Sequence, residues 1–326
     1  MPEATAFWVE MPGFGVLRHE PLREPGEGEV LVTTLYTGVS RGTEVAVFGG
    51  HVPESERQRM RAPFQQGDFP GPVKYGYLNV GIVERGPEAL AGQLVFTLFP
   101  HQSAFVVPAD AVVPVPAEIP ARRAVLAGAV ETAINVLWDA APLVGDRVSV
   151  VGAGMVGCCV ARLLHDIPGL EVTLIDINPA RKEVADRLGV DFADIPDAPH
   201  DRDIVINTSG SDAGLQLALE TVVTDGEVIE ASWYGDRPAT LMLGADFHSR
   251  RLTIRSSQVG SVALSRRGSR TTRERLKLAL QLLKDPAYDV LLTADSSWRD
   301  LPDVMASLAD GSRTDLCHTI NWGEPE

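Results

Sequence analysis

The run from Val148 to Gly157 constrains the fold more than any other part of the chain. A β-branched segment, 148–151, leads directly into a Gly-x-Gly-x-x-Gly turn made by Gly152, Gly154 and Gly157. Apolar residues then recur at helical spacing, so the pattern predicts a strand, a tight turn and a helix. Such a turn lets backbone amides and the positive end of a helix dipole approach a pyrophosphate, because no side chain holds it away.

A single carboxylate follows the next predicted strand. The strand 171–175 ends in Asp176, 19 residues after Gly157. At this place the carboxylate accepts hydrogen bonds from both hydroxyls of an adenosine ribose. A 2′-phosphate would meet a like charge there, so the sequence predicts NAD rather than NADP as the cofactor. Arg181 is the one nearby residue that weakens this preference.

Composition limits the partners and the compartment. A chain of 326 residues with 44% hydrophobic residues is long enough for two domains. Its net charge of -15 argues against nucleic acid and against an anionic membrane surface. Its three cysteines are too few for a disulfide framework or a four-thiolate zinc site, which favours a reducing cytoplasm. We expect no secretion signal, and no apolar run approaches the roughly 18 residues of a membrane helix.

The first part of the chain, 1–122, has the texture of an all-β domain. Short β-branched runs such as 29–36 and 80–83 are separated by Pro and Gly, which is typical of a barrel-like arrangement. Between them, the charged stretch 53–67 is expected to be a solvated helix or loop, or alternatively a lid beside a site.

The middle of the chain alternates between helix and strand signals. A long apolar helix is predicted for 123–141, followed by helices at 178–189 and 215–222 and strands at 203–207 and 226–230. Repeated β-α units require a doubly wound parallel sheet, and we expect it to end near Val259. Ligands of such sheets bind beyond the carboxyl ends of the strands, so Thr208, Ser209 and Trp233 are expected to face the nicotinamide end of a cofactor.

Two features follow the doubly wound segment. A basic patch, Arg266 to Arg275, opens a helix that is predicted to run to Lys284, and we interpret it as a solvated helix face or as an anion or subunit contact. The tail carries two predicted strands, at 291–293 and 317–320, which return to the first domain.

Several local motifs resemble those of one enzyme superfamily. Residues 38–44 resemble a G-[IV]-C-x-[ST]-D segment, residues 76–83 resemble G-H-E-x-x-G-x-V, and residues 145–148 resemble the G-[DE]-x-V lead-in to the glycine turn. With the order of predicted domains, these motifs make essentially the whole chain similar to the medium-chain dehydrogenase/reductase superfamily. Residues 247–252 and 256–260 further resemble its bacterial threonine-dehydrogenase-like or bacteriochlorophyllide-dehydrogenase-like subgroup.

The resemblance implies a fold and a function. The expected fold is α/β, with a Rossmann doubly wound parallel sheet at 123–259 and a β-rich GroES-like catalytic domain formed by 1–122 and 260–326. The implied function is that of an NAD-dependent oxidoreductase with a small-molecule substrate. A homodimer is implied as well, paired through an edge of the Rossmann sheet at Leu241, Met242 and Leu243.

The expected cofactor residues come from the glycine turn, from the acid after the second strand and from the resemblance to the superfamily. The resemblance implies that Thr132 takes the place of a threonine that packs near the nicotinamide. The full expected set is Gly152, Gly154, Met155, Val156, Gly157, Asp176, Ile177, Arg181, Thr132, Thr208, Ser209 and Trp233.

The metal pattern of the superfamily is not reproduced. The positions of its catalytic zinc ligands are taken by Ser40 or Arg41, by Tyr77 and Leu78, and by Ala127 and Gly128. The cysteines of its structural zinc lobe are missing too. We therefore expect no metal, because no thiolate or imidazole remains at these positions.

Without zinc, side chains must handle the hydroxyl proton. The sequence leaves Tyr77 and His101 open as the proton-transfer residue, with Thr43 as a relay and Glu44 as an orienting carboxylate bonded to the backbone or to Arg41. His101 alternatively has a purely structural role. Lys74, three residues before Tyr77, is expected to lower the pKa of that tyrosine.

Three functions remain open from the sequence. The leading one is a zinc-independent NAD(H)-dependent oxidoreductase acting on a hydroxyl or carbonyl of a small polar metabolite. The second is a zinc-less enoyl or quinone-type reductase of the same superfamily, which Asp176 disfavours because those enzymes usually prefer NADPH. The third is a non-catalytic dinucleotide-binding protein.

Overall fold

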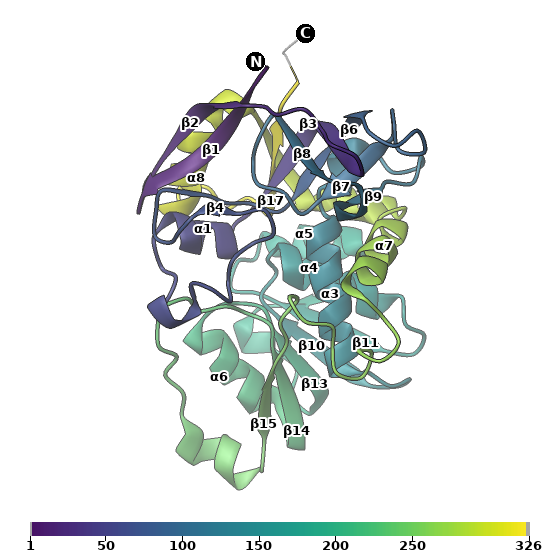
Figure 1. The fold of residues 1–326 in the computed structure, drawn as a ribbon. Helices are drawn as coiled ribbons and strands as arrows, with labels where there is room; N and C mark the ends of the chain where they lie inside the picture. The colour runs from purple at the N-terminus through teal and green to yellow at the C-terminus, as the bar shows by residue number, and fades with distance from the viewer. Residues whose placement is uncertain (1, 324–326) are drawn as a thin grey trace. The chain divides into compact units, whose positions relative to one another are not determined.

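The computed structural model describes residues 2–323 and divides into two compact units, each described here by itself (Figure 1). The first unit comprises residues 1–128, 280–284 and 292–326, and the second comprises 129–279 and 285–291. The sequence analysis assigned 260–279 to the first domain, whereas the structure groups this segment with the second unit. Within residues 2–323, no helix is both long and apolar enough to cross a membrane.

The second unit is built on a six-stranded parallel sheet. In spatial order its strands are β12 (Asp191–Ala193), β11 (Glu171–Ile175), β10 (Arg147–Val151), β13 (Arg202–Asn207), β14 (Val222–Glu230) and β15 (Thr253–Ser256). The strand order reverses between β10 and β13, so the glycine turn after β10 lies at the topological switch point, where such sheets bind ligands. The predicted Rossmann fold is confirmed.

Buried β-branched residues explain the central strand. In β10, Val148, Val150 and Val151 are all buried, as expected for a parallel strand covered on both faces. The helices of this unit are α3 (Ala127–Ala140), α4 (Met155–His165), α5 (Arg181–Leu188), α6 (Asp212–Thr221), α7 (Thr272–Leu282) and the short η3 (Ile195–Asp197), η4 (Leu243–Phe247) and η5 (Pro286–Leu291). Gly189 ends α5 in the left-handed conformation, with a φ of 76°.

Two predicted helices differ in detail. The long helix expected at 123–141 is split into α2 (Ala121–Ala124) and α3, with Val125 and Leu126 fully buried between them. Helix α5 starts at Arg181 instead of after Asn178, because the Asn178 side chain bonds the amide of Ala180 in a turn that precedes the helix.

The apolar sheet edge predicted at Leu241–Leu243 is also wrong. Leu241 and Met242 lie in the loop before η4, Leu243 is the first residue of η4, and the edges of the sheet are β12 and β15 instead. Met242 and Leu243 are exposed.

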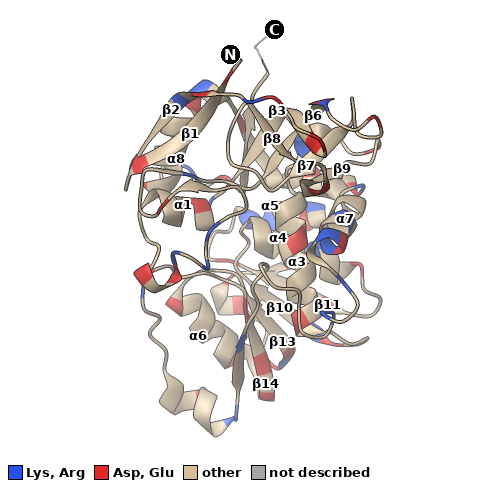
Figure 2. Cartoon of the chain, in the orientation of Figure 1, with Lys and Arg blue, Asp and Glu red and all other residues tan. Residues whose placement is uncertain are grey.

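The basic patch is smaller than predicted, although Figure 2 shows basic residues on α7 itself. Arg266, Arg267 and Arg270 are exposed, but Arg275 is only 1% exposed. Its guanidinium lies 3.1 Å from the Glu131 carboxylate, and burial raises the pKa of Glu131 while the arginine lowers it. Arg275 therefore belongs to the interior of the second unit and not to a solvated helix face.

The first unit contains two sheets. The smaller has the order β2 (Phe14–Pro21), β1 (Glu3–Met11), β5 (Val73–Lys74) and β4 (Gln66–Gly67). The larger has the order β16 (Leu292–Ser297), β17 (Cys317–Asn321), β3 (Glu29–Ser40), β6 (Asn79–Arg85), β7 (Leu94–Thr97) and β9 (Val112–Pro114), and β8 (Ala104–Pro108) pairs with β3. The predicted return of the tail strands to the first domain is confirmed.

Short helices complete the first unit. They are α1 (Thr43–Phe48), α2, α8 (Leu301–Ala309), η1 (Glu54–Glu56), η2 (Ala109–Ala111) and η6 (Trp298–Asp300). Valines of β3, β6, β7 and β8 form one buried cluster with Phe99 and Phe105, whose rings stack at 3.8 Å between centroids. The charged stretch 53–67 is irregular apart from η1 and the start of β4, and most of it is solvated.

Candidate functional site

The glycine turn of the second unit has the close packing that its motif predicts. Gly152 has a φ of 103°, which other residues rarely adopt. A Cβ on Gly157 would lie 1.9 Å from the Gly152 carbonyl oxygen and 2.5 Å from Thr208 Oγ1. Only glycine fits at these two positions, because β10, α4 and the loop after β13 meet there.

Gly154 differs from the other two glycines of the turn. It is the N-cap of α4 with extended backbone, and a Cβ there would meet nothing within 4 Å. No side chain caps the helix, so the first amides of α4, from Met155 and Val156, are left for a ligand or solvent. The Met155 side chain is buried, so this residue offers only its backbone. The space at Gly154 and the free amides suit an anionic group.

Asp176 is tied to the turn by two backbone hydrogen bonds. Its Oδ2 accepts from the amide of Ala153 at 2.7 Å, and its Oδ1 accepts from the amide of Asn178 at 2.8 Å. The carboxylate is half-buried, while the neighbouring Ile177 is exposed. Asp176 and Arg181 both act on the Cys158 thiol, where the carboxylate raises the pKa and the guanidinium lowers it. Arg181 therefore lies close to the same end of the turn.

The loop after β13 supports the turn from the other side. The Thr208 hydroxyl donates to the carbonyl oxygens of Val151 at 3.1 Å and Gly152 at 2.8 Å. The Ser209 hydroxyl donates to Asn207 Oδ1 at 2.8 Å. Both predicted cofactor residues thus form hydrogen bonds inside the protein, and their contact with a cofactor stays a prediction.

Glu230 centres a cluster that the sequence analysis missed. It ends β14, and its carboxylate accepts from Asn207 Nδ2 at 2.6 Å, from the Tyr234 hydroxyl at 3.1 Å and from the amide of Ser232 at 2.7 Å. Burial and this carboxylate raise the pKa of Tyr234. The signal available in the sequence was an acid at the carboxyl end of a predicted strand. Trp233, a predicted cofactor residue, is half-buried in the same loop, and Thr132 is half-buried on α3.

The first unit contains a buried network of hydrogen bonds around His101. Its Nε2 lies 2.7 Å from Glu44 Oε2, and its Nδ1 lies 2.7 Å from Thr37 Oγ1. Glu44 Oε1 also accepts from the amide of Ser40 at 2.8 Å, which is one of the two arrangements expected for it. Trp322 Nε1 donates to Thr37 Oγ1 at 2.9 Å. A carboxylate only accepts hydrogen bonds, so a bond between His101 Nε2 and an ionised Glu44 requires a proton on Nε2.

Tyr77 lies beside this hydrogen-bond network. It is half-buried, whereas His101 is 1% exposed. Its hydroxyl hydrogen-bonds with the side chains of Ser40 and Thr43. Burial and the charge of Glu44 raise the pKa of Tyr77, and the two hydroxyls only partly offset this. The four predicted catalytic residues Thr43, Glu44, Tyr77 and His101 are therefore brought together.

Gly76 explains how Tyr77 and His101 come so close. A Cβ on Gly76 would lie 2.9 Å from His101 Cδ2, and the residue has a φ of 128°. The backbone before Tyr77 therefore packs directly on the imidazole, which only a glycine permits.

The expected influence of Lys74 on Tyr77 is wrong. The Lys74 ammonium lies 2.6 Å from both Glu20 Oε2 and Gln102 Oε1, in a separate cluster, and it is not among the groups that shift the pKa of Tyr77. Spacing of three residues favours contact on a helix, but this stretch is extended.

The residues at the zinc positions do not suit a metal. Leu78 is 1% exposed, and a Cβ on Gly128 would lie 2.4 Å from its Cδ2, so apolar packing fills this place. Ser40 and Tyr77 offer only hydroxyls, which are poor zinc ligands. Among residues 2–323, no group of three or more His, Cys, Asp or Glu side chains is arranged to hold a metal ion.

Comparisons with known proteins agree with this fold. No model of a protein family matches the chain. An L-threonine 3-dehydrogenase of Mesorhizobium japonicum is 35% identical over 121 residues, which are 34% of this chain and 33% of that protein. The match therefore spans about a third of the length of this relative.

Solved structures match along nearly the whole chain. An alcohol dehydrogenase of Escherichia coli, solved with NADH, has a TM-score of 0.77 at 15% identity and covers 98% of this chain and 100% of its own. A protein of Sinorhizobium meliloti described as a zinc-binding dehydrogenase, solved with NADP, has a TM-score of 0.78 at 15% identity, again over 98% and 100%. The chain therefore has the fold of these dehydrogenases, and about a third of it is similar in sequence to L-threonine 3-dehydrogenases.

Proposed function

We propose that the chain is an NAD(H)-dependent oxidoreductase that interconverts a hydroxyl and a carbonyl group of a small polar metabolite without zinc. The observation that carries this proposal is the glycine turn at the switch point of the sheet, with Asp176 fixed beside it by two backbone amides. The sequence similarity to threonine dehydrogenases, the shared fold and the nicotinamide cofactors found in two structural neighbours support it.

The second unit would hold the dinucleotide by its backbone. The free amides at the start of α4 would bind the pyrophosphate, and the open space at Gly154 would admit it. Asp176 would bind the adenosine ribose, because it stays half-exposed while its own bonds fix its direction. Its negative charge favours NAD over NADP. Arg181 opposes this preference, and the neighbours solved with NADH and with NADP show that the fold admits both.

The first unit would handle the proton. When bound, the cofactor supplies or accepts the hydride. Tyr77 is the proton donor in the direction of carbonyl reduction, because its phenol is half-exposed and its hydroxyl is hydrogen-bonded to Ser40 and Thr43. Ser40 and Thr43 hydrogen-bond to its hydroxyl and offer a path by which the proton is replaced. His101 is too buried to touch a substrate, so it acts as a positioning residue that fixes Glu44.

A zinc-free mechanism rests on the donor set. The ligand positions of zinc-dependent relatives hold Ser40, Tyr77 and Leu78, and Leu78 is packed against Gly128. In this scheme the Tyr77 hydroxyl, as a hydrogen-bond donor, takes the place of the zinc ion that polarises the carbonyl group in zinc-dependent enzymes. Metal analysis of the purified protein checks it, and about one zinc per chain would contradict it.

Calorimetric titration with NADH and NADPH tests the cofactor site. We expect NADH to bind at least about tenfold more tightly, and we expect Asp176→Asn to remove most of that preference. Asp197→Asn is the matched control, because Asp197 is exposed and lies outside the turn. Equal binding of both cofactors by the natural chain would contradict the role of Asp176, and binding of neither would contradict the proposed function.

A homodimer and a cytoplasmic location stay part of the proposal. Both come from the resemblance and the composition, and β15 replaces Leu241–Leu243 as the edge through which two sheets would pair. Size measurement in solution tests the dimer.

A further inference from the structure

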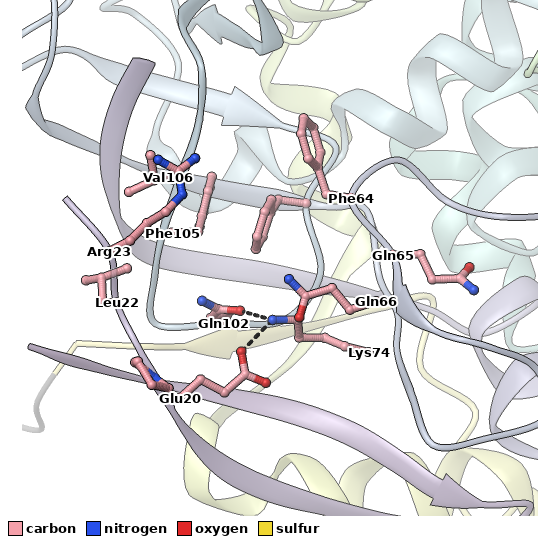
Figure 3. A pocket seen from close by; sticks show the side chains of 12 residues that line it. Glu20, Leu22, Arg23, Phe64, Gln65, Gln66, Lys74, Gln102, Phe105 and Val106 are labelled. Carbon is pink, nitrogen blue, oxygen red and sulfur yellow. Dashed lines mark hydrogen bonds and ion pairs between the residues drawn. The ribbon is translucent and has the colours of Figure 1, made fainter. Parts of the chain in front are cut away.

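The first unit contains a cavity outside the Tyr77 and His101 cluster. Its volume is about 420 Å³, which lies in the range of small-molecule sites. Rings of Phe64 and Phe105 line one part of it, and Lys74, Gln66 and Gln102 line another (Figure 3). Phe99 is also among the lining residues. A cavity with an apolar part and a few polar groups is typical of a binding site.

Residues that are adjacent in the sequence belong either to the cavity or to the cluster of Tyr77 and His101. Lys74 lines the cavity while Tyr75 and Tyr77 pack on each other with ring centroids 6.0 Å apart. Gln102 lines the cavity, while the preceding His101 bonds Glu44 and Thr37. The cavity is therefore distinct from the cluster, although both are lined by residues of the same two backbone segments, 74–77 and 101–102.

The charges that border the cavity are already compensated. Glu20 accepts from the Lys74 ammonium at 2.6 Å and from the Trp8 indole. Arg23 pairs with Glu29 at 2.6 Å. An added carboxylate would face Glu20, and an added ammonium would face Lys74. The electrostatics therefore favour a ligand without net charge.

Two polar groups of the cavity have hydrogen-bonding capacity that the protein does not use. An ammonium donates three hydrogens, and Lys74 gives one to Glu20 and one to Gln102 Oε1. Within residues 2–323 no nitrogen or oxygen accepts the third, and the ammonium also lies 5.7 Å from the centroid of the Trp8 ring. Lys74 is 1% exposed, so this unused donor is costly unless a ligand or solvent molecule accepts from it. In the same described range, the side-chain amide of Gln66 bonds to no protein group, and its residue pairs with Lys74 across β4 and β5.

We propose that this cavity binds an uncharged small molecule with an aromatic or planar apolar body and one hydrogen-bond acceptor. The body lies against Phe64, which is itself packed on Phe99 with ring centroids 5.5 Å apart. The acceptor takes the third hydrogen of the Lys74 ammonium, and Gln66 bonds the same polar end.

Three probes of one shape and different charge test this inference. Phenylacetamide, phenylacetate and phenethylamine are titrated into the full chain and followed by ligand-observed NMR. We expect phenylacetamide to bind saturably and at least about tenfold more tightly than either charged probe. The inference is overturned when phenylacetamide does not saturate up to its solubility limit, or when a charged probe binds equally well.

Variants locate the binding. Phe64→Ala removes the apolar wall, and Gln66→Ala removes a polar group that has no partner to lose, so neither exposed change threatens the fold. We expect each to weaken phenylacetamide binding about fivefold or more. Phe14→Ala is the matched control, because Phe14 is an exposed phenylalanine of the same unit that does not line the cavity. Equal binding by all three variants and the natural chain would place the ligand elsewhere and overturn the inference. None of these readouts depends on turnover, so the test is independent of the proposed function.

Discussion

The glycine turn of the second unit and the His101 cluster of the first unit are built in opposite ways. The turn uses mostly backbone from one short run, 151–157, with Asp176 and Thr208 as side chains that bond to it from outside. The cluster uses side chains from five separate places in the chain, at Thr37, Ser40–Glu44, Tyr77, His101 and Trp322. The first arrangement is local, and the second exists only in the folded unit.

This difference predicts how each region responds to substitution. Space limits substitutions in the turn. An added methyl group should destabilise the fold where it meets backbone, as at Gly157, and should weaken binding where it enters open space, as at Gly154. The cluster is limited by hydrogen bonds and charge, so isosteric changes of its side chains alter chemistry with little change in packing. The predictions below test that contrast.

Tyr77→Phe is expected to have the largest effect. Removing the phenol hydroxyl removes the proposed proton donor, so turnover of a carbonyl substrate should fall about 100-fold while cofactor affinity stays the same. Steady-state kinetics measures both. Tyr36→Phe is the control, because Tyr36 lies on β3 and has no part in the cluster. Unchanged turnover in Tyr77→Phe would remove this residue from the mechanism.

Gly157→Ala is expected to act on stability. Its Cβ would lie 1.9 Å from the Gly152 carbonyl oxygen, and backbone must move to admit it. We expect the free energy of unfolding to fall by about 1–3 kcal/mol, as in other overpacked positions, measured by urea denaturation. An unchanged denaturation midpoint would show that the turn is looser than its geometry indicates.

Gly154→Ala is the opposite case in the same turn. Its Cβ would meet nothing within 4 Å and its φ of -78° suits alanine, so stability should not fall. The methyl group would instead occupy the space offered to the pyrophosphate, and NADH affinity should drop about tenfold, or ~1.4 kcal/mol. Calorimetric titration measures this. Normal affinity would show that the phosphates bind elsewhere.

Glu44→Gln tests electrostatics in the cluster. The Glu44 charge raises the pKa of Tyr77, so its removal should lower that pKa, as measured by phenolate absorbance against Tyr77→Phe. The folded natural chain holds this proton more tightly than the unfolded chain, whose tyrosines titrate near 10. Its contribution to stability is therefore present below about pH 10 and is lost as the pH rises further. A higher pKa in the variant would contradict this account.

Thiol labelling of the native protein is expected to give no reaction in either region. Cys158 lies on α4 behind the turn and Cys317 lies near Glu44, and burial raises the pKa of each thiol to about 12. Neither should react with a disulfide reagent at pH 8 until the chain is unfolded, when all three cysteines should react. Rapid labelling of one thiol in the native protein would show which region opens.

The sequence predicted contiguous elements better than contacts between distant residues. The strands at 171–175 and 203–207 and the glycine turn depend on contiguous residues, and their predicted positions hold. Predictions that needed packing were less successful. Arg275 was grouped with exposed arginines because sequence spacing does not show that Glu131 is buried beside it. Lys74 was assigned to Tyr77 for the same reason, although an extended strand turns it toward Glu20 instead.

The sequence by itself determined the Rossmann sheet, the glycine turn and the acid that follows it, because glycine conformations and buried apolar runs act on neighbouring residues. Only the tertiary structure decided that His101 is a buried partner of Glu44, that Tyr77 is bonded to Ser40 and Thr43, and that Glu230 centres a second cluster. Hydrogen bonds between side chains depend on distances in space, and residues as far apart as Thr37 and Trp322 meet only after the sheet that joins them has formed.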